Sequence, residues 1–106
     1  MGATRIIDKV PKVRFEHWLD TCRIIVNPHA LDRLSEAQRK VFKGDELIDI
    51  LTKGKPILIG LQKNGRYAVF FKRSDGFIRI IFQISEDGKI EIGTFYNVDQ
   101  LPQLEK

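Results

Sequence analysis

Two polar residues that lie four positions apart, His29 and Arg33, are the strongest candidates for chemistry in this sequence. Asn27 suits the N-cap of a helix and Pro28 its first helical position, so the segment that follows is predicted to be helical. Side chains at positions i and i+4 share one face of a helix, so His29 and Arg33 point the same way. An imidazole titrates near neutral pH. The spacing therefore predicts a group for proton transfer beside a permanent cation.

The other reactive residue types give weaker signals. His17 is predicted to be a solvated side chain, and the lone Cys22 has no partner for a disulfide within the chain. An unpaired cysteine favours a reducing compartment, the cytoplasm, and we assign Cys22 no chemistry. The sequence has no glycine-rich phosphate loop, no zinc-binding pair of Cys or His, no nucleophile elbow and no acidic cluster for magnesium. We therefore predict a site without metal or cofactor, in which arginines, Thr94, Tyr67 and Tyr96 supplement a histidine.

The length and composition of the chain indicate one compact domain. The chain has 106 residues, of which 42% are hydrophobic, and a formal net charge of +4. This hydrophobic fraction can form a core, so disorder is not expected beyond the ends. Residues 1–22 are predicted to be an N-terminal extension with some helix, and residues 23–106 the domain itself. No apolar stretch approaches the roughly 18 residues that span a bilayer, so no membrane partner is predicted.

The positive charge is concentrated in the middle of the chain. Residues 55 to 83 contain six basic residues and a single acidic one, Asp75, whereas residues 84 to 106 are net acidic. We therefore expect an anion to bind the middle segment. Each basic residue taken singly has a simpler interpretation, as a solvating group beside a turn or strand end. The six are Lys55, Lys63, Arg66, Lys72, Arg73 and Arg79.

The hydrophobic pattern predicts an α+β fold. Helical spacing of apolar residues indicates helices over 13–22, 29–43 and 45–53, and a β-branched run indicates a short strand over 23–26. Four β-branched and aromatic runs follow, separated by Asn-Gly or Asp-Gly pairs that are typical of hairpins. We therefore predict N-terminal helices packed on one face of a four-stranded antiparallel meander. Its strands are residues 57–61, 67–72, 77–84 and 90–96.

The faces of the last hairpin follow from its loop. One face of the third run is uniformly apolar and must lie against the helices. A three-residue loop after this run, with Gly88 left-handed, pairs Ile84 with Ile90 and keeps the apolar residues together. Continued along the last strand, this register turns Thr94 and Tyr96 toward the helices.

The sequence leaves the registers of the first two hairpins open. One register places Ala68 and Phe70 against the helices, and the other places their neighbours in the strand there. The second sets Lys72 opposite Arg79, a repulsive pair, so we favour the first. Under both registers residues 57, 59 and 61 are buried, and the residues that point away from the helices are Arg79, Gln83 and Phe95.

Under the favoured register, the face away from the helices alternates aromatic residues with arginines. Bases can stack on the former and phosphates can pair with the latter. A face of this kind equally suits coverage by another protein chain, and the two interpretations carry equal weight. The residues are Tyr67, Phe71, Arg73, Phe77, Arg79 and Phe95.

Two segments resemble the small toxin-like families of the RelE and ParE type, and more closely a related uncharacterised group. The segment Val26-Asn27-Pro28-His29-Ala30-Leu31-Asp32-Arg33-Leu34 is similar to the strand and the His-Ala-x-x-Arg-Leu or Met helix with which that group begins. The segment Lys89-Ile90-Glu91-Ile92-Gly93-Thr94-Phe95-Tyr96 is similar to its last strand, an apolar run that ends in Thr and an aromatic residue. The resemblance covers approximately residues 23 to 98.

The resemblance implies a fold shared with endoribonucleases that cut messenger or transfer RNA without a metal ion. In such enzymes the ribose 2′-hydroxyl attacks the adjacent phosphate, aided by a general base, a general acid and cations. The residues that match are His29 and Arg33 in the helix and Thr94 and Tyr96 in the last strand, and Arg79 completes the predicted catalytic set. The implied partners are RNA and an antitoxin protein. The alternative is a non-catalytic module on the same fold that binds RNA or protein.

The predicted register divides this set. It places Thr94 and Tyr96 on the helix side, which suits an edge pocket near His29 but not a site on the face that carries Arg79. RNA is expected to contact the basic and aromatic side chains of the strands and turns. These are Lys63, Arg66, Tyr67, Phe71, Lys72, Arg73 and Phe95.

Overall fold

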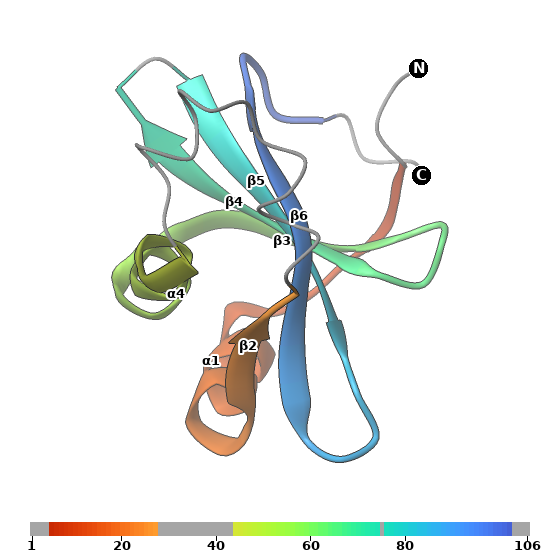
Figure 1. Ribbon diagram of the computed structural model, residues 1–106. Helices are drawn as coiled ribbons and strands as arrows, with labels where there is room; N and C mark the ends of the chain where they lie inside the picture. The colour runs from red at the N-terminus through yellow and green to blue at the C-terminus, as the bar shows by residue number, and fades with distance from the viewer. Residues whose placement is uncertain (1–4, 28–43, 75, 103–106) are drawn as a thin grey trace.

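The computed structural model describes residues 5–27, 44–74 and 76–102, which form two helices and six strands (Figure 1). The helix predicted over 29–43, with His29 and Arg33, lies outside the described residues. In chain order the elements are β1 (Ile6–Lys9), α1 (Lys12–Thr21), β2 (Arg23–Val26), α4 (Gly44–Lys53), β3 (Pro56–Gln62), β4 (Tyr67–Arg73), β5 (Gly76–Ile84) and β6 (Lys89–Val98).

The strands form one mixed sheet in the order β1-β3-β4-β5-β6-β2. The β2 strand is parallel to β6, and the other neighbours are antiparallel. The predicted four-stranded antiparallel meander with N-terminal helices is therefore wrong, because the meander from β3 to β6 is only the middle of a wider sheet. The two added strands have four residues each. That length is too short for a hydrophobic pattern to reveal which sheet edge a strand joins.

The N-terminal segment belongs to the same sheet and core. The β1 strand pairs with β3, and Phe15 of α1 is 1% exposed. Gly60 of β3 permits this arrangement, since a Cβ added there would lie 2.3 Å from Cγ2 of Ile6. The side chain of Ile6 can thus lie against β3 at this point only because Gly60 has no side chain.

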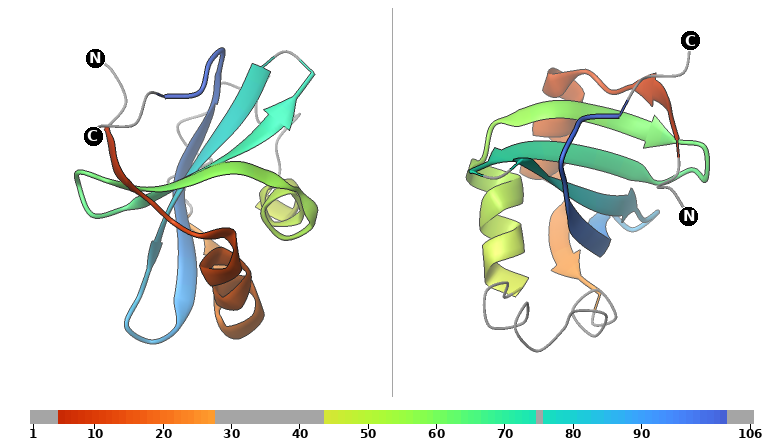
Figure 2. Two further views of the ribbon diagram at one scale, coloured as in Figure 1. Left: turned by 180° about the vertical axis from the view of Figure 1, so that it is seen from behind. Right: turned by 90° about the horizontal axis from the view of Figure 1, so that it is seen from above.

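Helices α1 and α4 cover one face of the sheet, where the main core lies (Figures 1 and 2). Phe15 from α1 and Leu47 from α4 pack there with the inward side chains of the meander. The ring centroid of Tyr67 lies 4.8 Å from that of Trp18 and 5.5 Å from that of Phe82. These aromatic contacts fix α1 against the centre of the sheet.

The opposite face of the sheet, called the helix-free face below, carries a smaller apolar cluster. The chain that follows β6 crosses this face (Figure 2). The face is therefore partly covered by the chain itself. The buried members of the cluster are Ile6, Ala68, Phe70 and Ile81, and the half-buried residues packed on them are Leu58, Val98 and Leu101.

The β3–β4 hairpin adopts the alternative register and not the favoured one. The amide of Gln62 donates to the carbonyl of Arg66 at 2.8 Å, which closes a three-residue loop in which Gly65 has a φ of 86°. The odd-numbered residues of Tyr67–Phe71 consequently face the helices, and the even-numbered ones lie on the helix-free face. The placement of Ala68 and Phe70 against the helices is wrong.

The repulsion that disfavoured this register does not arise. Lys72 pairs with Phe77, and Arg79 pairs with Phe70. Gly76, with a φ of 131°, is the first residue of β5 and not part of the loop. The strands are therefore shifted by two residues relative to the pairing that would oppose the two cations.

The β3 strand is irregular where it begins. Its register shifts between Pro56 and Leu58. As a result Ile57, which both sequence registers predict to be buried, is 45% exposed, whereas Ile59 is 5% exposed.

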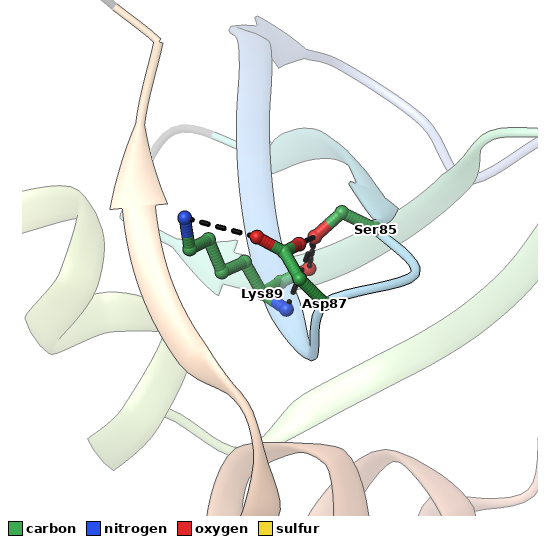
Figure 3. Close-up of polar contacts among 3 residues, drawn as sticks. All are labelled: Ser85, Asp87 and Lys89. Carbon is green, nitrogen blue, oxygen red and sulfur yellow. Dashed lines mark hydrogen bonds and ion pairs between the residues drawn. The ribbon is translucent and has the colours of Figure 1, made fainter.

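The β5–β6 hairpin confirms its predicted loop. Gly88 has a φ of 79°, and the amide of Ser85 donates to the carbonyl of Lys89 at 2.9 Å. The Asp87 carboxylate accepts a hydrogen bond from the Ser85 hydroxyl and lies 3.0 Å from Nζ of Lys89 (Figure 3). The Ser85 hydrogen bond, followed by the contacts with Lys89, lowers the pKa of Asp87 from its ordinary value.

The substitution Asp87→Asn should lower the free energy of unfolding at pH 7. A carboxyl whose pKa is lowered by folding stabilises the protein above its unfolded pKa, here 3.8, and loses that effect as the pH falls through the folded pKa. Urea unfolding between pH 7 and acid pH should therefore show the variant and the parent converging below pH 3.8. Glu86→Gln, in the same loop, is the matched control. A difference that does not change with pH would contradict this role.

Candidate functional site

A β-bulge at Gly93 determines which residues of β6 reach the helix-free face. The predicted register, which pairs Ile84 with Ile90, continues to Phe82 opposite Ile92, but Thr94 pairs with Ile81, so the register shifts between these last two pairs. The extra residue reverses the alternation of side chains beyond it. Phe95 is therefore buried in the helix-side core, where it is 5% exposed.

The bulge places three predicted site residues on one face. Tyr96 pairs with Arg79, and Thr94 lies two residues before it on the same side of β6. The prediction that Thr94 and Tyr96 point toward the helices is wrong, and so is the prediction that Phe95 points away from them. Burying a phenylalanine contributes about 1.5–3 kcal/mol, a gain that the unbulged register would forgo.

Arg79 lies at the centre of the helix-free face but is only 3% exposed. Its guanidinium carbon is 5.1 Å from the ring centroid of Phe70 and 5.9 Å from that of Tyr96. A guanidinium nitrogen donates a hydrogen bond to Oε1 of Gln62. Burial lowers the pKa of Arg79, and Tyr96 acts in the opposite direction. At this depth Arg79 can orient its neighbours, but it does not present its charge to solvent.

Hydrogen bonds connect this buried arginine to the β3–β4 loop. Gln62 is 2% exposed, and its Nε2 donates to Oδ1 of Asn64 at 3.1 Å. The same Oδ1 accepts from the backbone amide of Arg66 at 3.0 Å. These hydrogen bonds run from Arg79 through Gln62 to Asn64. They thus fix the backbone of Arg66, whose side chain carries the next positive charge.

A cavity of about 200 Å³ lies beside the bulge. Asn27 at its wall donates to Oε1 of Glu91 at 2.9 Å, which holds the carboxylate in place. The cavity brings a carboxylate, a guanidinium and a hydroxyl together, from Glu91, Arg66 and Thr94. Its other lining residues are Ile81, Phe82, Gln83 and Gly93.

The chemistry of this cavity suits part of a polyanion. Its volume is below the roughly 300–1,000 Å³ of most sites for whole small molecules. A guanidinium binds phosphate oxygens, and a carboxylate can accept a proton from a hydroxyl. One phosphate and its ribose, belonging to a longer chain, match both the size and the donor set. Among the described residues, no three His, Cys, Asp or Glu side chains are grouped so that they could hold a metal ion.

The remaining predicted site residues fall into three groups. Lys63 is exposed in the β3–β4 loop, next to the cavity residue Arg66, and its amide donates to the carbonyl of Arg5 at 2.9 Å. Lys72 and Arg73 lie at the far end of β4. The aromatic residues Tyr67, Phe71 and Phe95 belong to the helix-side core, and the latter two are 3% and 5% exposed.

Because these three aromatic side chains pack in the helix-side core, bases cannot stack on them. The prediction that they lie on the face away from the helices is wrong. Its cause is the register of β4 for Tyr67 and Phe71, and the bulge for Phe95.

Sequence reasoning missed Glu91, Gln62 and Asn27 as site residues. Glu91 pairs with Gln83 and points away from the helices, but in the sequence a single acid without an acidic cluster suggests no role. An isolated glycine inside a strand is a known sign of a bulge, and Gly93 could have revealed the change of face. Nothing in the sequence indicates that Gln62 is buried, because its partners Arg79 and Ile6 come from distant segments.

Comparisons with models of protein families, with curated proteins and with solved structures find no match to this chain. The resemblance to the RelE and ParE type therefore stays a prediction, and the function has to be argued from the site itself. Within the part of the chain that the structure describes, none of the helices is long and apolar enough to cross a bilayer.

Proposed function

We propose that this protein is a metal-independent endoribonuclease of toxin type, which cleaves RNA by attack of a ribose 2′-hydroxyl on the adjacent phosphate. The observation that supports the proposal is the bulge at Gly93. It places Thr94 and Tyr96 on the face that carries Arg79, beside a cavity that holds Arg66 and Glu91. Thr94 and Tyr96, the residues that match the resemblance in the last strand, thereby lie on the same face as the Arg66 guanidinium and the Glu91 carboxylate.

Glu91 and Arg66 of the cavity, together with Tyr96, which lies on the same face outside the cavity lining, divide the reaction among them. Glu91 accepts the proton of the ribose 2′-hydroxyl while the 2′-oxygen forms a bond to phosphorus. Arg66 pairs with the non-bridging oxygens and stabilises the charge of the phosphorane. The bond from phosphorus to the 5′-oxygen then breaks, and Tyr96 donates a proton to that oxygen. The products are a 2′,3′-cyclic phosphate and a 5′-hydroxyl.

Arg79 acts in this proposal as a positioning residue. It is buried beneath Tyr96, so it holds the phenol ring and does not touch the phosphate. His29 and Arg33 lie outside the described residues, and the roles that the resemblance gives them stay part of the proposal. Asn27, which positions Glu91, precedes His29 by two residues in the sequence.

The purified protein should cleave single-stranded RNA in EDTA and leave 2′,3′-cyclic phosphate ends. Glu91→Gln is expected to reduce the cleavage rate by about 10²–10⁴-fold, the usual contribution of a general base. Arg66→Ala should reduce it through loss of phosphate stabilisation, and His29→Ala tests the residue implied by the resemblance. Glu86→Gln, an exposed acid on the neighbouring loop, is the control.

Two outcomes would contradict the proposal. Cleavage that requires a divalent metal would exclude the mechanism, and cleavage unaffected by Glu91→Gln and Arg66→Ala would exclude the site. RNA binding without any turnover would instead identify the non-catalytic module that the sequence leaves as an alternative.

A further inference from the structure

A second cationic cavity lies at the opposite end of β4 from Arg66. It has a volume of about 320 Å³ and is lined by Lys55, Lys72 and Arg73, with Ile50, Gly54 and Phe71. Among the residues that the structure describes, the three charged ones that line it are all basic. Arg73 follows Arg66 by seven positions, which extend over about 23 Å at the rise of a β-strand. The two cavities are therefore too far apart to hold the same phosphate.

Gly54 makes this cavity possible. A Cβ added at Gly54 would lie 2.8 Å from Cδ1 of Phe71 and 2.5 Å from the carbonyl oxygen of Ile50. Only glycine lets the end of α4 approach β4 so closely, and this approach brings Lys55 to the cavity that Lys72 also lines. Two exposed lysines, Lys55 and Lys72, thus line one cavity, and a bound anion would relieve the repulsion between them.

Asp49, which precedes the cavity residue Ile50 in α4, has a partner within its own helix. Asp49 forms an ion pair with Lys53 on the same helix, with a distance of 3.4 Å from Oδ1 to Nζ. Lys55 and Lys72 are exposed to solvent, so a ligand can reach both ammonium groups. Asp49 is thus paired with Lys53, four residues along the same helix.

A smaller cavity continues this surface along the sheet. It has a volume of about 160 Å³ and shares Arg73 with the larger one. Asn97 of β6 also lines it, and this residue lies on the helix side of the sheet because it pairs with the core residue Ile78. Phe77 and Ser74 complete the wall and offer a ring for stacking and a hydroxyl for hydrogen bonding.

We propose that the cavity of Lys55, Lys72 and Arg73 binds a phosphate of single-stranded RNA several nucleotides away from the phosphate held by Arg66. This inference rests on the proposed function for the choice of RNA as the anion. It assigns the two lysines a role in substrate length preference, because only an RNA that spans both cavities gains the second contact.

Binding of uncleavable RNA tests the inference. Fully 2′-O-methylated oligonucleotides of 2 to about 16 nucleotides lack the attacking hydroxyl, and their affinity is measured by fluorescence anisotropy over a range of salt concentrations. The slope of log K against log salt is about −0.7 per phosphate contact for a single strand. The double variant Lys55→Ala/Lys72→Ala should flatten the slope for the longest oligonucleotide by about 0.7, because the cavity holds one phosphate. The dinucleotide should bind the variant and the parent equally.

Lys53→Ala is the matched control, since it removes an exposed lysine of α4 that is paired with Asp49. An unchanged slope in the double variant, or the same change in Lys53→Ala, would overturn the inference. Competition by inorganic phosphate as strong as that by long RNA would also overturn it, because the cavity would then hold a free anion. If the parent cleaves RNA but the double variant has the same salt slope as the parent, only the second contact is refuted. If the slope changes as expected but the parent does not cleave RNA, only the proposed function is refuted.

Discussion

Deletion of Gly93 should lower the free energy of unfolding by about 3–5 kcal/mol, the cost typical of removing a buried phenylalanine from a core. Without the bulge, the strict alternation of a β-strand would carry Phe95 out of the helix-side core. The same shift would turn the hydroxyls of Thr94 and Tyr96 into that core, where each needs a new hydrogen-bond partner. Urea unfolding followed by the fluorescence of Trp18 measures the effect.

Gly93→Ala is the matched control for this deletion. A Cβ added at Gly93 would have no heavy atom within 4 Å, and the backbone there does not have the positive φ that favours glycine. The substitution keeps the number of residues in β6, so its cost should stay within about 1 kcal/mol. If the deletion and the substitution were equally stable, the bulge would not determine which side chains form the core.

The sequence predicted the parts of the fold that are specified by neighbouring residues. The four strands of the meander follow from β-branched and aromatic runs, and the third loop follows from Asp87-Gly88. The pairing of Ile84 with Ile90 follows from that loop and the alternation of apolar residues. Each of these features is determined within a few residues along the chain.

The rest of the sheet depends on contacts between distant segments. β1 joins β3 because Ile6 fits against Gly60, and β2 joins β6 in parallel although more than sixty residues separate them. The helix-free face was expected to be open, yet Val98 and Leu101 cover its apolar cluster. No local pattern in the sequence encodes these pairings.

The candidate site was only half predictable for the same reason. Thr94 and Tyr96 came from the resemblance of the last strand, and the sequence register put them on the wrong side of the sheet. The expected repulsion between Lys72 and Arg79 favoured the wrong register of β4. It does not arise, because Lys72 pairs with Phe77, two residues before Arg79. Predicting the face of a strand requires every bulge and loop length to be right, since one extra residue reverses all side chains beyond it.

The pair of buried polar residues, Gln62 and Arg79, should show strong coupling in a double-mutant cycle. Gln62→Leu removes the oxygen that accepts from the buried guanidinium, and it should cost about 1.5–3 kcal/mol, the contribution of a hydrogen bond to a charged group. Arg79→Met keeps the apolar part of the side chain between Phe70 and Tyr96, but it leaves the Gln62 amide without this donor. Denaturant unfolding of both single variants and of the double variant completes the cycle.

The double variant Gln62→Leu/Arg79→Met should be at least as stable as either single variant. It replaces a buried polar pair by an apolar pair, so neither polar group is left buried without its partner. Additive losses would contradict the coupling. RNA affinity should nevertheless fall, since the double variant lacks the Gln62 amide that holds Asn64 and thereby the backbone of Arg66. The loss of RNA affinity in Arg66→Ala is the largest loss that misplacing Arg66 can cause. A protein that is stable but binds RNA poorly would show that the buried pair is retained to position the phosphate-binding arginine, since an apolar core would serve stability as well.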